Sequence, residues 1–343
     1  MATKITIADI ARQAGVSITS VSFALNGQPG VSDRTREHIR QVARELGWVP
    51  SMRGRNIAGR RADAIGLVIE RNPSVISLDP FFSTFIAGVE AELEPRERAL
   101  VLQVSQDRGS TVRRYRRLVD DGRVDGVILS DLEVADRRVD LLAELGLPAV
   151  GLMADDDFAL PSVRQDHRRG IDQIVRHLAA HGHRQICHLA GLPTVIHTKQ
   201  RLAAWRQSME SAGLEPGPVE YADFTVAGGA GATERLLGYT PRPTAIVCAN
   251  DLMAIGAIQK LRQLGLEVPG DVSVTGYDGI EIGQYVTPAL TTVVTDPAEV
   301  GRRAAALLLD LIDRRDVDDV DVEPAKLAVR GSTGPVPHEA AGR

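Results

Sequence analysis

The spacing of apolar residues divides the chain into a short helical beginning and a long remainder in which strands and helices alternate. Before residue 50, apolar side chains recur three or four positions apart, as they do on one face of a helix. After residue 63, continuous apolar runs are separated by longer helical patterns, which predicts parallel sheets covered on both faces. The predicted strands are 65–68, 100–104, 127–129, 149–152, 185–189, 245–248 and 272–275, and helical patterns between them include 85–93, 171–180 and 251–264.

Three helices are predicted in the first fifty residues. Thr6 and Asp9 have the spacing of a capping box at a helix start, and Gly15 supplies the positive φ that ends that helix. Ser17 caps a second helix, and a third begins near Ser32 and buries a stripe of apolar residues. Two short helices joined by a glycine turn, with a third packed against them, form a helix-turn-helix. The spacing alone leaves a generic three-helix bundle open.

The second predicted helix has a short, lightly polar face. If Val21 and Leu25 face the core, the outward residues are Ile18, Thr19, Ser22 and Phe23. Side chains of this size can approach base edges in DNA, and hydroxyls at the helix start can meet phosphates at the positive end of the helix dipole.

Charge is distributed unevenly along the 343 residues. The net charge is −5, but residues 1–62 hold ten basic and four acidic side chains, which leaves −11 for the remainder. A basic head on an acidic body is typical of a polyanion contact confined to the head. No apolar run is long enough to span a membrane, and the N-terminus lacks the apolar stretch of a signal peptide. Cys187 and Cys248 lie in apolar runs, and we expect reduced core cysteines in a cytoplasmic protein.

The stretch TIADIARQAGVSITSVSFALNGQPGVSDRTREHIRQVARELGWVPS resembles the DNA-binding head of the LacI (lactose-repressor) family. The resemblance implies that Ile18, Thr19 and Phe23 read bases in the major groove. It also implies contacts to the DNA backbone from Thr6, Ser17, Ser20, Ser22 and Asn26. Phe23 departs from the polar residue more usual there, because its ring can touch a thymine methyl but cannot donate a hydrogen bond to guanine.

Residues 51–63, SMRGRNIAGRRAD, follow Pro50 and resemble the family's hinge, which becomes helical on DNA and inserts a leucine into the minor groove. Here Ile57 takes the leucine position, and Arg55 is implied as a second minor-groove residue. Gly54 costs a hinge helix about 1 kcal/mol relative to alanine. An ordinary charged linker between domains is the alternative.

The body resembles the same family's periplasmic-binding-protein-like core (type I), through stretches such as DPFFSTFIAGVE, RLAAW, PTAIVCANDLMAIGA and VPGDVSVTGYD. The implied fold class is a small all-α helix-turn-helix head followed by a two-lobed α/β core of parallel sheets. The expected divisions are a head at 1–50, a hinge at 51–63, an N-lobe of 64–162 and 293–322, a C-lobe of 163–292 and 323–333, and a disordered tail at 334–343. Pro95 departs from the family pattern and predicts an early end or a kink in the helix after DPFF.

Several residues near predicted strand ends form a candidate effector site. Arg201, Asn250 and Asp278 supply a guanidinium, an amide and a carboxylate, which suit hydroxyl recognition, and the resemblance implies that they grip sugar hydroxyls. It also implies pocket walls at Phe81, Phe82 and Phe224 and a polar contact at Thr295. Asp251 is interpreted as a helix cap. Met153 stands where some sugar-binding relatives place an aspartate, so the identity of the effector stays open; the following aspartates, 155–157, compensate only if the loop is re-routed.

Other patterns in the sequence predict no metal-binding, nucleotide-binding or catalytic site. The histidines at 177, 181, 183 and 188 lack metal-ligand spacing because Gly182 breaks the helix between them, and GGAGATERLLG is neither a dinucleotide-binding fingerprint nor a P-loop. No nucleophile motif is present. The sequence therefore predicts no catalytic residue, no metal and no cofactor.

These observations together predict a cytoplasmic, homodimeric transcriptional regulator, more specifically a repressor. It binds double-stranded DNA at a pseudo-palindromic operator and responds to a small effector, for which we favour a saccharide. A regulator that responds to a nucleobase or another non-sugar metabolite is the alternative. A sugar-transport receptor and an α/β enzyme are rivals from other classes; the receptor would need an export signal and no head, and the enzyme would turn over a substrate.

Overall fold

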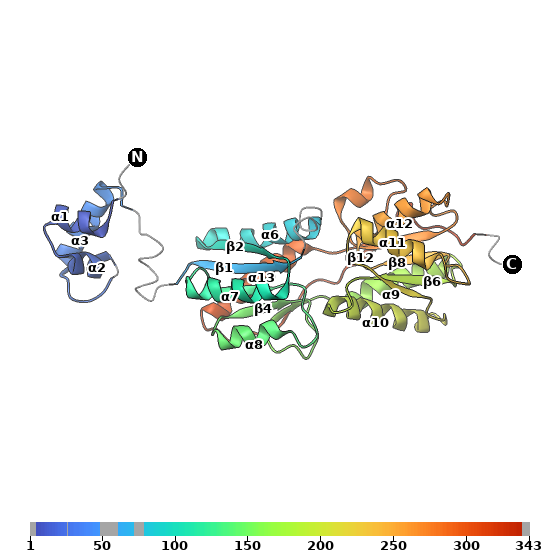
Figure 1. Ribbon diagram of the computed structural model, residues 1–343, viewed down its shortest axis with the longest axis horizontal. Helices are drawn as coiled ribbons and strands as arrows, with labels where there is room; N and C mark the ends of the chain where they lie inside the picture. The colour runs from blue at the N-terminus through green and yellow to red at the C-terminus, as the bar shows by residue number, and fades with distance from the viewer. Residues whose placement is uncertain (1–4, 26, 49–60, 72–78, 338–343) are drawn as a thin grey trace. The chain divides into compact units, whose positions relative to one another are not determined.

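The computed structural model describes residues 5–25, 27–48, 61–71 and 79–337. The chain forms two compact units, a head up to Ala62 and a core from Asp63 onwards (Figure 1). The predicted fold class is confirmed: the head is helical and the core consists of two α/β lobes. Among the described residues, no helix combines the length and the apolar character needed to cross a membrane.

The head contains helices α1 (Ile7–Ala14), α2 (Ile18–Leu25) and α3 (Asp33–Glu45). The predicted capping box is present between Thr6 and Asp9, and Gly15 has a φ of 67°. The side chain of Ser32 accepts a hydrogen bond from the backbone of α3. The hydrophobic core of the head consists of Ile10, Ala11, Val21, Ala24, Ile39, Val42 and Ala43. One prediction is corrected: Ala24, three residues after Val21, is buried, whereas Leu25 is only half-buried.

The N-lobe is built on one sheet with the strand order β11-β5-β4-β3-β1-β2. Its strands run parallel, and helices α6 and α13 cover one face while α7 and α8 cover the other (Figure 1). Its elements are β1 (Ala64–Glu70), α6 (Pro80–Leu93), η1 (Glu94–Arg96), β2 (Ala99–Ser105), α7 (Arg108–Asp120), β3 (Gly126–Leu129), α8 (Arg137–Glu144), β4 (Ala149–Leu152), β5 (Ser162–Arg164), α13 (Pro297–Ile312) and β11 (Val320–Asp321).

The C-lobe has a second sheet with the order β12-β10-β9-β8-β6-β7, in which only the β10–β12 pair is antiparallel among the pairs described. Helices α11 and α12 pack on one face, and α9 and α10 pack on the other. Its elements are α9 (His167–Ala180), β6 (Ile186–Ala190), α10 (Ile196–Ser211), β7 (Val219–Tyr221), α11 (Val226–Leu236), β8 (Ala245–Cys248), α12 (Asp251–Gln263), β9 (Ser273–Asp278), η2 (Glu281–Gln284), β10 (Thr291–Val294) and β12 (Lys326–Ala328).

The chain passes between the two sheets three times, and two of the predicted lobe boundaries need correction. All of β5 pairs in the first sheet, so the first passage follows Arg164 rather than residue 162. All of β10 pairs in the second sheet, so the second passage follows Val294 rather than residue 292. The third lies between β11 and β12, around the predicted residue 323. The boundaries shift because backbone pairing continues two residues beyond each predicted boundary.

The predicted disordered tail is also partly wrong. The backbone N–H of Gly334 donates to Ser273 Oγ, and that of Val336 donates to the carbonyl of His181. Residues 334–336 are therefore fixed to the C-lobe, while 338–343 lie outside the described residues.

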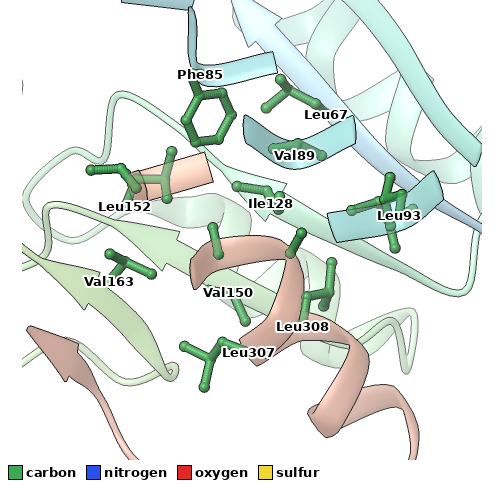
Figure 2. Packing of buried hydrophobic residues seen from close by; sticks show 14 of the residues in the cluster. Leu67, Phe85, Val89, Leu93, Ile128, Val150, Leu152, Val163, Leu307 and Leu308 are labelled. Atoms are coloured by element: carbon green, nitrogen blue, oxygen red, sulfur yellow. The ribbon is translucent and has the colours of Figure 1, made fainter. Parts of the chain in front are cut away.

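The largest hydrophobic cluster of the N-lobe lies between its sheet and the α6–α13 pair (Figure 2). Phe85, Val89 and Leu93 of α6 meet Leu307 and Leu308 of α13 over the strands. The two helices approach closely through glycine: a Cβ added at Gly88 would lie 2.0 Å from the carbonyl oxygen of Ala298. As Pro95 predicts, α6 stops at Leu93 and continues only as a short 3₁₀ turn.

Candidate functional site

A pocket in the core collects side chains from both lobes at the carboxyl ends of their parallel strands. This edge is where ligands bind in open α/β sheets. Arg71 follows β1, Asp131 follows β3, Asn250 follows β8 and Asp278 ends β9. The described lining residues are Arg71, Asp79, Phe81, Phe82, Ser130, Asp131, Leu152, Met153, His197, Arg201, Phe224, Asn250 and Asp278.

The structure brings most of the predicted effector residues together. Phe81, Phe82, Arg201, Phe224, Asn250 and Asp278 all line this pocket. The prediction that Thr295 contacts the effector needs correction, because Thr295 does not line the pocket. Its hydroxyl instead donates to the backbone carbonyl of Asp278 at 3.0 Å, so it lies behind the pocket wall.

The C-lobe wall centres on Arg201 and Asp278. The guanidinium of Arg201 lies 4.0 Å from the ring centroid of Tyr277, and its Nη1 donates to the carbonyl of Ala249. Nη2 lies 3.5 Å from the Asp278 carboxylate, beyond the usual length of a charge-assisted hydrogen bond. Burial raises the pKa of Asp278 well above its ordinary value, even though Arg201 opposes this shift. Asp278 is therefore a buried carboxyl that a hydrogen-bond donor from a ligand would stabilise.

Asn250 caps α12 and contributes to the same wall. Its Oδ1 accepts from Met253 N at 2.9 Å and its Nδ2 donates to the carbonyl of Phe224 at 3.1 Å. The interpretation of Asp251 as the cap is therefore wrong, because Asn250 holds that position.

Asp251 is fully buried and bonds to distant backbone and side-chain groups instead. Its carboxylate accepts from Ile280 N at 2.7 Å and from Thr292 Oγ1 at 2.5 Å. Burial raises the pKa of Asp251 to about 7. This carboxyl ties the loop after Asp278 to β10.

The N-lobe wall contains an ion pair that the sequence analysis missed. Arg71 donates from Nε and Nη2 to the two carboxylate oxygens of Asp131, at 2.8 and 2.7 Å. Burial opposes the charge of Asp131, yet Arg71 lowers its pKa to about 2. Beside them, Asp79 caps α6 by accepting from Phe81 N at 3.0 Å, and burial raises the pKa of Asp79.

The aromatic walls differ in how much surface they offer. Phe81 is half-buried and stacks on Phe85, with centroids 6.2 Å apart. Phe224 is only 3% exposed, because the guanidinium of Arg71 lies 4.9 Å from its centroid and the backbone of Gly191 lies against its ring. Phe224 is therefore a packed wall, and it offers no open face on which a sugar could stack.

The residues that sequence reasoning missed are Arg71, Asp79, Ser130, Asp131, Leu152 and His197. A usable signal existed at Arg71 and Asp131, since both follow apolar strand runs at the edge where ligands bind. Burial, followed by the charge of Arg201, lowers the pKa of His197 to about 3, so its ring is neutral at pH 7. Met153 lines the pocket with a φ of 55°, and the three following aspartates lie outside its lining.

The head places its predicted DNA residues unevenly. Ile18 is 51% exposed and Thr19 is exposed, as a base-reading face requires. Phe23 is half-buried, and its ring lies 3.1 Å from where a Cβ on Gly30 would stand, so it does not project freely. Ser17 Oγ accepts from Ser20 N at 3.0 Å, which caps α2.

Other predicted DNA contacts are placed differently or lie outside the description. The hydroxyl of Thr6 donates to Asp9 within the capping box, and Ser22 is half-buried. Asn26, Arg55 and Ile57 lie outside the described residues.

The histidine cluster has other roles. His183 bonds to Thr244 and to the carbonyl of Gly334, and His188 bonds to the carbonyl of Val247 while stacking on Trp205. In the described part of the chain, no group of three or more histidine, cysteine or acidic side chains is placed to hold a metal ion.

A helix-turn-helix head joined to a two-lobed core with a polar pocket defines a ligand-responsive DNA-binding regulator. The family model for bacterial regulatory proteins of the lacI family matches residues 6–51, and that for the periplasmic binding protein-like domain matches residues 175–333. The HTH-type transcriptional regulator CelR of Thermobifida fusca is 33% identical over 312 residues, covering 90% of this chain and 92% of the relative. The chain belongs to the lacI family of bacterial regulatory proteins.

Other relatives agree over nearly the whole chain. The HTH-type transcriptional repressor CytR of Escherichia coli (strain K12) is 30% identical over 347 residues, covering 98% of both chains. A complex of CelR with cellobiose has a TM-score of 0.74 at 32% identity, covering 96% of this chain and 100% of that one. A lac repressor dimer bound to operator and the anti-inducer ONPF has a TM-score of 0.81 at 28% identity, with coverage of 97% and 100%. These relatives are regulators, and the chain is not an enzyme.

Proposed function

We propose that this chain is a cytoplasmic, homodimeric transcriptional repressor whose affinity for a pseudo-palindromic operator is controlled by a saccharide bound in the core pocket. The observation that carries the proposal is the convergence of Arg201, Asn250 and Asp278 with the buried Asp79. Hydroxyl groups can donate to such carboxyls and accept from the guanidinium. The relative that forms a complex with cellobiose supports a sugar in particular.

The contacts between the lobes offer a route from the pocket to the rest of the core. Ile196 N donates to the carbonyl of Leu132 at 2.8 Å, and Gln200 donates to that of Ala154 at 3.1 Å. Both donors belong to α10, which also carries the pocket residues His197 and Arg201. A ligand that binds one arrangement of the lobes more tightly shifts the population toward it and, by linkage, changes operator affinity through the hinge at 51–63.

The direct test is operator binding by the full chain with and without candidate effectors. Bound fragments selected from random DNA supply the operator, which is then titrated in the presence of cellobiose, other sugars, nucleosides and purines. We expect a sugar to change DNA affinity at least about tenfold, within the range of typical allosteric coupling. A chain lacking residues 1–62 loses DNA binding altogether. Attachment to DNA without the head contradicts the proposal.

A nucleobase effector is the second candidate. The half-buried ring of Phe81 favours it, since a flat aromatic face in a pocket can stack on a base. The same titration separates the two, because release of DNA by adenosine or guanine and by no sugar contradicts the saccharide.

A further inference from the structure

The Arg71–Asp131 pair has a geometry that limits what Arg71 can offer to a ligand. The bidentate contact uses Nε and Nη2, one of the two edges by which a guanidinium can grip a carboxylate or phosphate. The plane of the guanidinium is covered as well, since it lies 4.9 Å from the centroid of Phe224 and 5.9 Å from that of Phe82. Arg71 is therefore already paired and packed, and its contacts with the described residues leave the Nη1 hydrogens and one Nη2 hydrogen unused.

Beyond this pair, the described lining residues hold one cation, Arg201, and two carboxyl groups, Asp79 and Asp278, whose pKa values burial raises. Among the described lining residues, Arg71 and Arg201 face three carboxyl groups, those of Asp79, Asp131 and Asp278. His197 adds no charge at pH 7, because its pKa is lowered to about 3. In sequence, residues 72–78 contain no ionisable side chain. A ligand anion would add negative charge beside the ionised Asp131 and would further oppose ionisation of Asp79 and Asp278, and its cost rises as water is excluded.

The same wall suits neutral hydroxyl groups. Ser130 lines the pocket and is 4% exposed, and its Oγ has no hydrogen-bond partner among the described residues. Asp79 and Asp278 lack guanidinium contacts as close as that of Asp131, and a hydroxyl can donate to either. A hydroxyl can also accept from the remaining hydrogens of Arg71.

We propose that the Arg71–Asp131 pair is a specificity-determining element that makes the pocket select an uncharged polyhydroxyl ligand and reject its phosphorylated form. This inference builds on the proposed role of the pocket as the effector site. It applies equally to a free sugar or a nucleoside, because it concerns the charge of the ligand. Asp131 acts by compensating the charge of Arg71 and by occupying one of its two bidentate edges.

Calorimetric titration of the full chain tests this with probes matched in all but charge. The pairs are glucose with glucose 6-phosphate, and adenosine with AMP; inorganic phosphate is titrated alone. We expect the native chain to bind whichever neutral member it accepts at least about tenfold more tightly than the phosphate ester. It should not bind inorganic phosphate. Equal or tighter binding of the ester overturns the proposal.

Two variants should weaken this selection against phosphorylated ligands, here called the charge filter, in different ways. Asp131→Asn frees the edge of Arg71, and Asp79→Asn removes a carboxylate while retaining an amide that can still cap α6. Each should gain binding of inorganic phosphate and move the neutral-to-phosphate affinity ratio about tenfold toward the ester. Operator binding without ligand reports folding, and if Asp131→Asn fails to fold, the preference of the native chain between each neutral probe and its phosphate ester decides. Asp310→Asn, which alters an exposed carboxylate paired with Arg315, is the matched control and should gain nothing.

The titrations with inorganic phosphate and the phosphate esters keep the saccharide proposal and the charge-filter proposal distinguishable. If no sugar releases the operator but a nucleoside does, the saccharide proposal fails while the charge filter is still tested by adenosine and AMP. If no neutral probe binds, inorganic phosphate decides. Phosphate bound only by the two variants supports the filter. Phosphate bound by the native chain and lost in Arg71→Lys, or no gain in either variant, overturns it.

Discussion

The two walls of the pocket hold their buried carboxyl groups in opposite ways. In the N-lobe, Asp131 is gripped by both arms of Arg71 and its pKa is lowered to about 2. In the C-lobe, Asp278 lies 3.5 Å from Arg201 and its pKa is raised. The difference shows that burial alone does not set the protonation state of a carboxyl group. The position of the neighbouring guanidinium decides whether the negative charge is compensated. In the N-lobe wall the charge of Asp131 is compensated, whereas Asp79 of the same wall and Asp278 of the C-lobe wall can still accept from a ligand.

The largest expected effect is a loss of stability on removing Arg71, the guanidinium that is paired with Asp131. Arg71→Met leaves Asp131 buried without its partner and should lower the free energy of unfolding by about 3–5 kcal/mol, as for other broken buried pairs. Urea denaturation of the core measures this. Arg303→Met is the control, since its pair with Glu299 is solvent-exposed and such pairs contribute roughly 0–1 kcal/mol. A loss no greater than that of the control would show that the N-lobe pair is not compensated as described.

The second prediction concerns pH and contrasts Asp131 with Asp251. The folded pKa of Asp131 lies below its ordinary value of 3.8, so its contribution is present above that pH and is lost as pH falls toward 2. The folded pKa of Asp251, about 7, lies above 3.8, so its contribution is present below pH 3.8 and is lost as pH rises toward 7. From the pKa shift of Asp251, at about 1.36 kcal/mol per unit, we expect a loss of about 4 kcal/mol at pH 7.

Unfolding free energies between pH 4.5 and 7.5 check this second prediction. The native chain should lose stability over that interval more steeply than Asp251→Asn, which has no carboxyl to ionise at that position. Parallel curves for the two proteins would rule out a raised pKa at Asp251.

The third prediction addresses the ligand directly. Asp278→Asn should weaken effector binding about two- to tenfold, because burial raises the pKa of Asp278 and a hydrogen bond between neutral groups contributes about 0.5–1.5 kcal/mol. Asp131→Asn should weaken binding of the same neutral effector less, since Asp131 is already satisfied by Arg71. Calorimetry with the effector found in the operator assay gives both values. A larger loss in Asp131→Asn would reverse the assignment of the two walls.

The smallest effect is expected at Thr295. Thr295→Val removes the hydroxyl that donates to the carbonyl of Asp278 and should cost about 1 kcal/mol of stability. Effector affinity should change less than about threefold, or ~0.7 kcal/mol, because Thr295 does not line the pocket. A tenfold loss of affinity with unchanged stability would place Thr295 in contact with the ligand.

The sequence predicted the C-lobe wall better than the N-lobe wall for a physical reason. Arg201, Asn250 and Asp278 stand in stretches that resemble a known family, so their roles could be carried over. Arg71 and Asp131 are sixty residues apart, and their contact depends on β1 and β3 being neighbours in the sheet. Apolar runs predict that strands exist, but they do not give the order in which strands pair.

Local rules also failed where distant partners decide. Asp251 has the residue type and the position of a helix cap, yet its carboxylate bonds to Ile280 and Thr292. The polar, glycine- and proline-rich tail predicted disorder, but backbone hydrogen bonds at Gly334 and Val336 fix its first residues. Capping in the head was predicted correctly, because Thr6 and Asp9 interact within one turn.

The burial of Ile196 affects how easily the two lobes can separate. It begins a helix of the C-lobe, yet its side chain is 4% exposed and belongs to a hydrophobic cluster of the N-lobe. Any opening motion at this point must bring that side chain into water, at a cost of about 1.5–3 kcal/mol. A bias of that size favours the shut form roughly ten- to a hundredfold before any effector arrives, so an effector that opens the lobes must prefer the open form by more than that factor.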